Sequence, residues 1–427
     1  MQQAMHSAAG RGAEAAQRVG GAGIVLLGVL ALAMQLPVTL PVPVLRGLVQ
    51  ERFAVSELLA SLFMSANMVG AVIAAPLAGA LADRFGRRPL CIAAALLADA
   101  LLFLSLTLEL PYAAFLTLRF FEGCAHISAI SLLLGLAADA RPAAERGWVM
   151  GVVGAGMMLG VGIGAPLGGW LGADDVLRPL YIGAALLLAC APAVLWLRET
   201  AARQHRHRPG LAEIAGLLRR RRLLLLPLLF AFADRFTVGF FTTTFSFFLS
   251  SVHGFAAPQI GVLFGFFMLP FAMLSLPCGW LSQRSSRALL LCGGSLLYGA
   301  LVASLGHWPG AWLVAPMLAS GAAAALMFVP SLLMTSELTP GAARTTALGA
   351  FNAAGSLGFI IGPVVGGAVS QIVAADWGWL TGYRAAFWVA GASEIALALL
   401  AFPLLWRFEK SAWNQPGAGE PGAAGSG

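Results

Sequence analysis

Long apolar runs alternate with short polar segments along nearly the whole chain. About 20 apolar residues span the hydrocarbon core of a bilayer as an α-helix. The runs are continuous and do not alternate residue by residue, which excludes a transmembrane β-barrel. The pattern predicts twelve transmembrane helices, at residues 22–44, 54–81, 89–109, 112–137, 147–170, 177–197, 223–250, 257–282, 288–306, 311–336, 345–371 and 384–406.

Composition supports a membrane protein with many spans. Hydrophobic residues make up 59% of the 427-residue chain, charged residues only 11%, and the mean hydropathy is +0.84. Soluble domains carry about a quarter charged residues. The first 20 residues are polar and lack the apolar core of a cleavable signal, so the first helix is expected to be retained. The five cysteines have no metal-ligand spacing, and we expect no metal site.

The net charge of +7 is distributed unevenly over the predicted loops. Most of the 26 lysines and arginines fall on one side if the N-terminus lies inside the cell. This is the positive-inside bias, and it argues against a nucleic-acid partner. We expect both termini in the cytoplasm and a multi-pass location in a bacterial-type inner (plasma) membrane. The predicted parts are an N-tail (1–21), a first six-helix bundle (22–197), a basic linker (198–222), a second bundle (223–406) and a disordered tail (407–427).

Glycines recur at fixed spacing in the fifth and eleventh predicted helices. A helix this poor in side chains must pack closely against a neighbour. The pattern of the fifth helix returns 198 residues later in the eleventh, and so do features of the loops that precede them. The chain is therefore predicted to be an internal duplication. The glycine-pattern residues are Gly151, Gly160, Gly164, Pro166 and Gly168, and then Gly358, Gly362, Pro363 and Gly366.

Three sequence features resemble the major facilitator superfamily. The loop after the second helix, GALADRFGRRPL, is similar to that family's cytoplasmic signature. Leu116, Arg119, Glu122 and Gly123 are similar to its second signature. The glycine stretch resembles the antiporter motif of the drug:proton antiporter branch, although Ala165 separates Gly164 from Pro166. The residues of the first signature, which the resemblance makes a conformational-switch loop, are Gly79, Asp83, Arg84, Gly86, Arg87 and Arg88.

The resemblance implies an all-α membrane protein with two pseudo-symmetric six-helix bundles. It implies a transporter that works by alternating access and is not an enzyme. It also implies that helices 5 and 8, and helices 2 and 11, meet across the divide between the bundles. On this basis we expect the glycine surfaces to lie beside that divide.

Ionisable residues inside a bilayer cost free energy and usually face an interior cavity. Arg119, Glu122 and His126 are spaced i, i+3, i+7 and fall within about 60° of one helix face. An acid beside a base can alternate between an ion pair and a protonated acid, which is what proton coupling requires. The alternative is a static pair that stabilises the helix. Asp99 and Glu394 stand isolated in the sequence, and each is either functional or a packed, partnered or interfacial group.

In the second half, Asp234 is the best candidate for a proton-coupling acid. Its neighbour Arg235 should point about 100° away, so each needs another partner. The seventh helix is rich in phenylalanine, which suits a broad apolar cavity. The first helix lacks the acid that some drug antiporters have there. The predicted substrate-cavity residues are Gln35, Thr39, Arg119, Glu122, His126, Asp234, Arg235, Phe236 and Phe240.

The linker contains an amphipathic segment. Leu211, Ile214, Leu217 and Leu218 share one face and are followed by Arg219 to Arg222. This arrangement predicts an interfacial helix on the anionic inner leaflet.

The energy source is constrained by the single lysine, Lys410, because a phosphate-binding loop needs a lysine of its own. We therefore expect no cofactor and a proton gradient as the source of energy. The first hypothesis is a monomeric, proton-coupled multidrug efflux antiporter for small amphipathic molecules. The second is an uptake symporter or facilitator for a small organic metabolite, in which Arg119 and Arg235 clamp an anion. The third is a non-transporting sensor or scaffold with the same fold.

Overall fold

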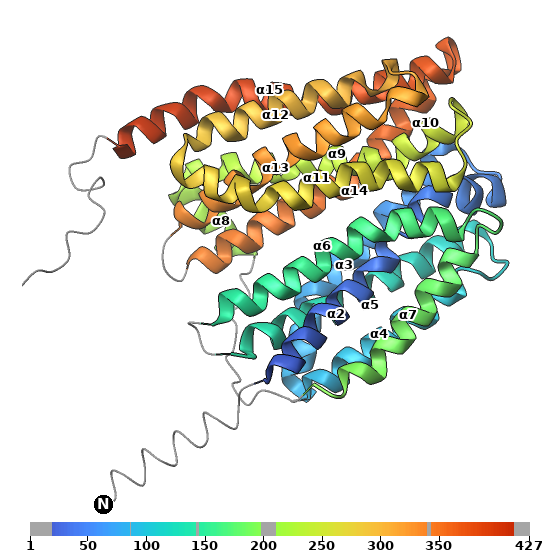
Figure 1. Ribbon diagram of the computed structural model, residues 1–427, viewed down its shortest axis with the longest axis horizontal. Helices are drawn as coiled ribbons and strands as arrows, with labels where there is room; N and C mark the ends of the chain where they lie inside the picture. Colours follow the sequence, from blue (N-terminus) through green and yellow to red (C-terminus); the bar gives the residue numbers. More distant parts are fainter. Residues whose placement is uncertain (1–18, 86, 142–144, 198–210, 340–342, 414–427) are drawn as a thin grey trace, which may run out of the picture. The chain divides into compact units, whose positions relative to one another are not determined.

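The computed structural model describes residues 19–85, 87–141, 145–197, 211–339 and 343–413, where long helices are joined by short turns and loops (Figure 1). Eleven helices in these ranges are long and apolar enough to cross a membrane. The sixth predicted span, 177–197, corresponds to α7 (Arg178–Val194), which is apolar but shorter. The predicted N-tail lies outside the described ranges up to residue 18, and so does most of the predicted C-terminal tail.

The helices of the first half follow the predicted spans closely. Its first helix is predicted over 22–44, whereas α2 ends at Thr39 and the chain continues as a 3₁₀ turn and a π-helical turn as far as Glu51. Prolines 37, 41 and 43 remove backbone donors along this stretch, which favours the change in helix type. The elements are α2 (Gly21–Thr39), η1 (Val42–Val44), η2 (Arg46–Glu51), α3 (Glu57–Phe85), α4 (Arg88–Ser105), α5 (Tyr112–Asp139), α6 (Arg146–Leu171) and α7.

The second half repeats this order after a short helix, α8 (Leu211–Arg220). Its first long helix also contains a π-helical turn, η4 (Phe241–Phe245). The last helix reaches Trp413, so residues 407–413 of the predicted disordered tail are helical. The remaining elements are η3 (Arg222–Leu224), α9 (Leu225–Phe240), α10 (Ser246–Ser251), α11 (Ala257–Arg284), α12 (Arg287–Ser304), η5 (Leu305–His307), η6 (Gly310–Trp312), α13 (Val314–Glu337), α14 (Ala343–Trp377) and α15 (Trp379–Trp413).

The chain forms two compact units that do not coincide with the two halves. The first unit contains residues 1–208 together with 239–265 and 359–382. The second contains residues 209–238, 266–358 and 383–427. One end of α11 and one end of α14 therefore pack with the first half, although both helices belong to the second.

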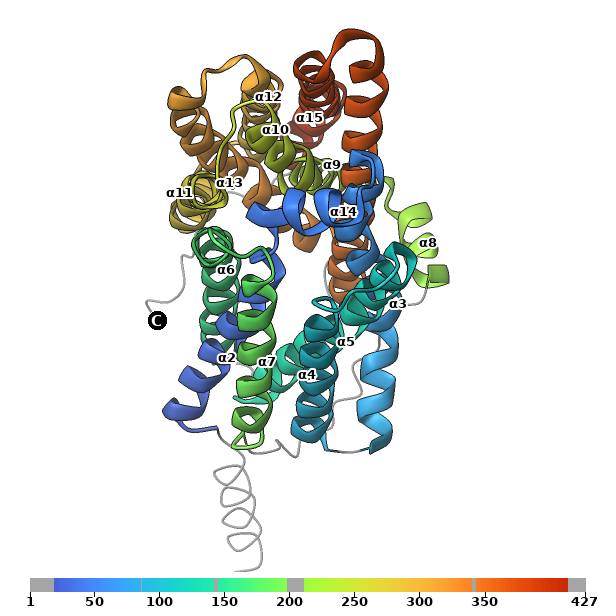
Figure 2. The same ribbon diagram turned by 90° about the vertical axis from the view of Figure 1, so that its right-hand side faces the viewer.

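The glycine face of α6 is covered by α2, and the two helices run side by side in Figures 1 and 2. A Cβ atom on any of four α6 glycines would overlap backbone oxygen atoms of α2. Only glycine permits this approach. The four are Gly156, Gly160, Gly164 and Gly168. The expectation that this face lies beside the divide between the bundles is therefore wrong for the three that belong to the predicted pattern, Gly160, Gly164 and Gly168, which pack within their own half.

Gly151 and Pro166 differ from the other glycine-pattern residues of α6. A Cβ atom at Gly151 would meet no other atom within 4 Å, so Gly151 takes no part in close packing here. Pro166 lies on the side of α6 that faces α11, where its ring is 3.0 Å from the Cβ position of Gly265.

The eleventh-helix repeat packs in the equivalent way. Gly358 of α14 lies against the backbone of Phe232 on α9, and Pro363 lies against Gly239. A Cβ atom at Gly366 would overlap the Thr244 hydroxyl of η4. Close packing of the first and fifth helices of each half is thus a shared feature of the duplication.

Within the first unit, the predicted outer ends of the two halves are in direct contact. Ser65 on α3 donates a hydrogen bond to the Ile360 carbonyl of α14 at 2.7 Å. Ser246 on α10 donates to the Val42 carbonyl at 2.8 Å. Gly169 of α6 approaches the α11 backbone at Ala257. Contacts between helices 5 and 8 and between helices 2 and 11, implied by the resemblance, are therefore present at these ends.

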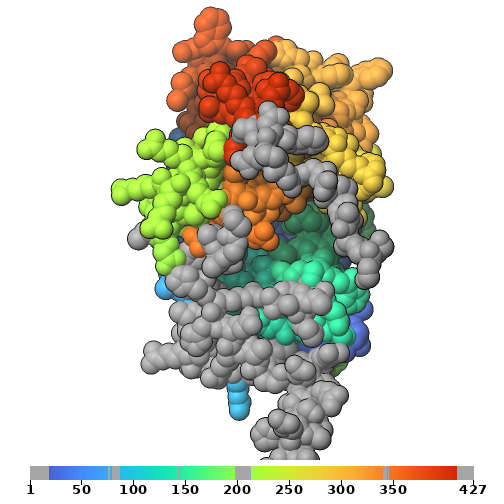
Figure 3. Space-filling view, turned by 90° about the vertical axis from the view of Figure 1, so that its left-hand side faces the viewer, coloured from blue at the N-terminus to red at the C-terminus, as the bar shows by residue number. Residues whose placement is uncertain are grey.

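Helix α8 packs on its own unit through its apolar face. Ile214, Leu217 and Leu218 contact buried residues of α9 and α14, including Leu228 and Ala347. Figure 3 shows α8 in lime green at the surface beside the orange start of α14. These three side chains are partly buried against the protein, and the interfacial position of α8 stays a prediction. Their neighbours Arg219 and Arg220 remain exposed.

Candidate functional site

Helix α5 carries three ionisable side chains into the interior of the first unit. Arg119, Glu122 and His126 are exposed to only 1%, 3% and 9%. They occupy one helix face, as their spacing predicts. Polar groups buried in this way need hydrogen-bond partners, and α2, α3 and α4 supply them.

Glu122 is held between a base and an amide. Arg119 Nη1 lies 2.7 Å from Glu122 Oε2, and Asn67 Nδ2 on α3 donates to the same oxygen at 2.6 Å. A Cβ atom at Gly123 would overlap the Asn67 backbone carbonyl, so the glycine allows α3 to come this close. The Arg119 guanidinium also lies 4.3 Å from the centre of the Phe63 ring, a cation–π contact.

His126 joins Asp99 to Gln35. Its Nδ1 lies 2.9 Å from Asp99 Oδ2 on α4, and its Nε2 lies 3.2 Å from Gln35 Oε1 on α2. Asp99 is fully buried. Asp99, which has no partner nearby in the sequence, therefore has one in the structure, because the carboxylate reaches the α5 histidine across a helix–helix contact.

The hydrogen-bond arrangement around His126 depends on one proton. Both ring nitrogens face oxygen atoms, and an imidazolium donates from both. A neutral imidazole has one donor, so it would satisfy Asp99 and leave its other nitrogen facing the Gln35 oxygen. Turning the Gln35 amide over by 180° would present its NH₂ group instead. Loss of a proton therefore changes the orientation that Gln35 prefers.

The cluster formed by Asp99, Glu122, Arg119 and His126 has an unbalanced formal charge when the histidine is neutral. Two carboxylates face one guanidinium, which leaves a net charge of −1. Uptake of one proton makes the buried group neutral. Burying net charge is costly, so this arrangement favours a bound proton. Two atoms of the cluster, Asp99 Oδ1 and Arg119 Nε, have no hydrogen-bond partner among the described residues.

The same residues could coordinate a cation by geometry alone. One ligand atom from each of Asp99, Glu122 and His126 lies within 4.8 Å of the others. Two carboxylates and an imidazole suit a first-row divalent metal. However, the Arg119 guanidinium already binds Glu122 and would place a positive charge beside the metal. The arrangement fits a proton better than a divalent cation.

Other residues predicted to line the cavity are used in helix packing. Thr39 donates to the Val161 carbonyl of α6 at 2.9 Å and lies over Gly164. Phe240 is fully buried, and its ring packs against Gly366. Phe236 is 8% exposed and stacks on Phe232 with ring centres 6.0 Å apart.

Asp234 and Arg235 lie in the second unit and are paired with each other. Arg235 Nε lies 3.3 Å from Asp234 Oδ2. Adjacent positions on a helix do point about 100° apart, but the long arginine side chain folds back to its neighbour. The expectation that both need other partners for this reason is therefore wrong. Asp234 is buried, whereas the Arg235 side chain is 44% exposed.

The predicted switch loop is only partly visible. Gly86, together with the side chains at positions 79, 83 and 84, lies outside the described part, and Arg87 is exposed. Arg88 Nη1 binds Asp139 Oδ2 at the end of α5, at 2.6 Å. In the second half, Arg287 and Glu337 form the equivalent ion pair. The loop after helix 8 has therefore kept an arginine–carboxylate pair, although Gln283 stands there in the place that Asp83 takes in the first half.

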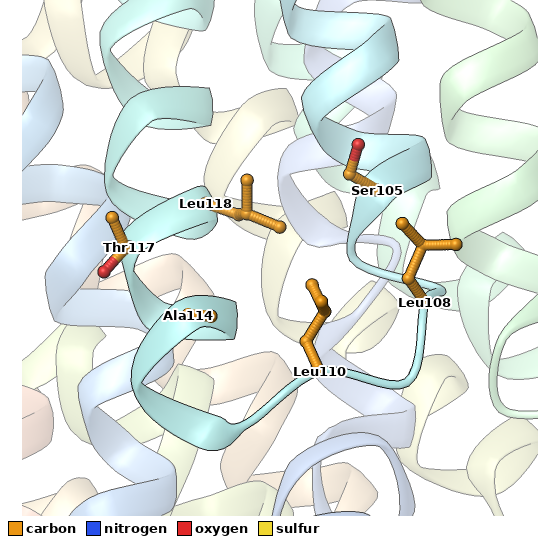
Figure 4. Close-up of a pocket in the computed structure, with 6 residues that line it drawn as sticks. All are labelled: Ser105, Leu108, Leu110, Ala114, Thr117 and Leu118. Carbon is orange, nitrogen blue, oxygen red and sulfur yellow. The ribbon is translucent and has the colours of Figure 1, made fainter.

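A surface pocket lies where α4 connects to α5. Its lining is mostly apolar, and Figure 4 shows its residues on the two helix ends and the connecting loop. It contains no ionisable side chain and lies apart from the α5 cluster. The lining residues are Ser105, Leu108, Leu110, Ala114, Thr117 and Leu118.

Sequence reasoning missed Asn67 and the pairing of Asp99. Both are strongly polar residues in the middle of predicted spans, and that position was the available signal. Sequence position alone could not show that α3 and α4 bring them to α5.

Membrane-spanning helices arranged as a duplication around buried ionisable side chains define a helical membrane transporter. The chain matches the family model of the Major Facilitator Superfamily over residues 25–257 and 228–425, and it belongs to that superfamily. The chain is 28% identical over 411 residues to mouse (Mus musculus) "Major facilitator superfamily domain-containing protein 10", covering 86% of this chain and 82% of that one.

Solved structures share the fold at low sequence identity. A bacterial homologue of the human lysosomal transporter Spinster, inward-facing and unoccupied, matches with TM-score 0.77 and 16% identity over 92% of this chain and 98% of its own. The nucleoside transporter NupG (D323A mutant) gives 0.75 and 16% over 90% and 99%. A D-xylose–proton symporter gives 0.73 and 17% over 90% and 96%. These structures do not single out the drug:proton antiporter branch.

Proposed function

We propose that the protein is a proton-coupled antiporter that exports a small amphipathic organic molecule, with the proton bound in the cluster of Asp99, Glu122, Arg119 and His126. The observation that carries the proposal is the net charge of this cluster. Its charge of −1 with neutral histidine is cancelled by one proton, and one proton is also what re-orients Gln35. These two properties suit a site at which binding of a proton changes a hydrogen bond to the neighbouring helix α2.

Antiport follows from competition. A cationic solute near the cluster would cancel the same charge as the proton, so each would disfavour the other. The cluster offers no free positive group to bind an anionic co-substrate, because Arg119 is 1% exposed and already bound to Glu122. This argues against Arg119 as an anion clamp.

A proton gradient supplies enough free energy for such transport. One proton crossing about 100 mV releases ~2.3 kcal/mol. A tenfold solute gradient costs about 1.4 kcal/mol. One proton per cycle would therefore support accumulation of a neutral solute by more than tenfold, whereas one-for-one exchange with a monovalent cation moves no net charge and is driven by the pH difference alone.

Proteoliposomes with an imposed pH gradient of either sign test the proposal. The panel would contain amphipathic organic cations, nucleosides and pentoses, the last two chosen because structural relatives carry such solutes. For an antiporter, acid-inside vesicles take up the cations as protons leave. If a panel member is taken up only when the outside is acidic, the protein is a symporter and the antiport proposal is wrong. Equal uptake under both gradients, and without one, would indicate a facilitator.

A further inference from the structure

The second unit contains a buried carboxyl group that is not part of the α5 cluster. Glu394 lies in the interior of α15 and is 0% exposed. Its Oε2 atom has no hydrogen-bond partner among the described residues, and no ion pair joins Glu394 to a cation in that part of the chain. An ionised carboxylate in this position would be an uncompensated buried charge, which is strongly destabilising.

Close helix packing places Glu394 against α12. Gly299 of α12 and Gly391 of α15 approach so closely that a Cβ atom on either would overlap the backbone carbonyl oxygen of the other or lie within 2.7 Å of it. The Cβ position of Gly299 is 3.0 Å from the Cβ of Glu394. Tightly packed glycines leave little room for water at this level.

The neighbours of the Glu394 carboxyl are hydroxyl groups and an acid. Thr237 on α9 and Ser295 and Tyr298 on α12 supply the hydroxyls, and Asp234 on α9 is a charged group that acts on the Glu394 carboxyl. Asp234 is compensated by Arg235 at 3.3 Å. Among the described residues, no positively charged group acts on the Glu394 carboxyl.

The Thr237 hydroxyl lies closer to a backbone carbonyl than to the Glu394 carboxyl, and this difference bears on which group donates a hydrogen bond to the other. Thr237 Oγ1 lies 2.7 Å from the Asp234 backbone carbonyl and 3.5 Å from Glu394 Oε1. A hydroxyl has one hydrogen, and the shorter contact to the carbonyl uses it. The remaining contact is favourable if Glu394 donates its own hydrogen to the Thr237 oxygen. A protonated Glu394 can do this and an ionised one cannot.

We propose that Glu394 is a second proton-binding site, located in the C-terminal half, and that its carboxyl group is protonated in this conformation. Asp234 carries the negative charge beside it, so the two acids hold one proton between them. A movement that separates Asp234 from Arg235 would shift this proton from Glu394 toward Asp234. The role of this site in transport rests on the proposed function, whereas the protonation of Glu394 does not depend on it.

Infrared spectroscopy of the purified full-length protein tests the protonation directly. Protonated carboxyl groups in apolar surroundings give a carbonyl band that ionised carboxylates lack, and deuterium exchange shifts this band. We expect the band in wild type at neutral pH and its loss in Glu394→Gln. The matched control is Glu109→Gln, an exposed glutamate in the loop between α4 and α5, which should leave the band unchanged. A band identical in wild type and Glu394→Gln would overturn the proposal.

A second variant guards against misfolding. Glu394→Gln resembles the neutral acid in shape, so thermal unfolding should shift little and gel filtration should be unchanged. Glu394→Lys would bury a new charge and should fail to fold. If Glu394→Gln unfolds as readily as Glu394→Lys, the native residue acts as a charged group, and the proposal fails.

A separate transport experiment tests whether Glu394 takes part in proton coupling. With the organic-cation panel, Glu394→Gln should lower the number of protons moved per solute without abolishing solute exchange. An unchanged proton-to-solute ratio would remove Glu394 from coupling. Absence of proton coupling in wild type would instead overturn the proposed function and leave the infrared result standing.

Discussion

The Asp99 carboxylate on α4 lies 2.9 Å from His126 Nδ1 on α5, inside the first unit of the protein. It joins two polar positions that lie far apart in the sequence into one buried, hydrogen-bonded group. The ring continues to Gln35 on α2, and the Arg119–Glu122 pair lies on the same helix face. Helices α4 and α5 of the first half therefore supply the cluster, and α2 and α3 supply its hydrogen-bond partners Gln35 and Asn67.

Replacing the carboxylate tests this link. Asp99→Asn keeps the shape and removes the charge that holds a proton on His126. We expect proton-driven transport in proteoliposomes to fall on the order of 100-fold, by analogy with losses at acid–base sites, while solute exchange without a gradient continues. Asp174→Asn serves as the control, because Asp174 is an exposed acid of the loop between α6 and α7. Proton-driven transport at wild-type rates in Asp99→Asn would separate Asp99 from coupling.

Two substitutions of Glu122 separate its effect on proton-coupled transport from its effect on the stability of the fold. Glu122→Ala leaves the guanidinium of Arg119 buried without its partner, which costs about 3–5 kcal/mol. Glu122→Gln keeps an acceptor for Arg119 and should be much better tolerated, yet it should lose proton-driven transport. Thermal unfolding in detergent and gradient-driven uptake measure the two effects. Equal destabilisation by Ala and Gln, or full proton coupling in Gln, would contradict this assignment.

The glycine face of α6 provides a matched pair of substitutions. Gly164→Leu would force a side chain into the backbone of α2 and the Thr39 hydroxyl, and overpacking of this kind costs about 1–3 kcal/mol or more. Gly151→Leu on the same helix meets no atom within 4 Å at its Cβ position. It should be neutral, or stabilising by up to about 1 kcal/mol through helix propensity. Yield of folded protein and unfolding temperature give the comparison. Similar behaviour of the two variants would show that α2 does not restrict α6.

The two equivalent ion pairs should differ in strength. The Arg88 and Asp139 side chains are 15% and 2% exposed, whereas those of Arg287 and Glu337 are 28% and 49% exposed. A double-mutant cycle to alanine should give a coupling energy of about 1–3 kcal/mol for the first pair. The second should give less than about 1 kcal/mol, because solvent screens it. Coupling energies in the reverse order would contradict the burial-based ranking.

Some site residues could be identified from sequence because an ionisable group in an apolar span is rare. Arg119, Glu122 and His126 share a face through helical spacing alone, and the structure places them together. Asn67 could not be assigned a partner, since that required knowing that Gly123 lets α3 approach α5. The direction of the α6 glycine face was assigned wrongly for the same reason, because glycines predict close packing but do not name the neighbour.

The sequence by itself determined that the chain crosses a membrane many times, that it is a duplication, and that it resembles its superfamily. These properties follow from bilayer thickness, from helix periodicity and from repeated spacings, which are local along the chain. Only the tertiary structure decided that Asp99 pairs with His126, that Arg235 folds back to Asp234, and that Glu394 stands among hydroxyls without a cation. Such partnerships depend on which helix faces meet and how closely, and glycine contacts between distant segments control both.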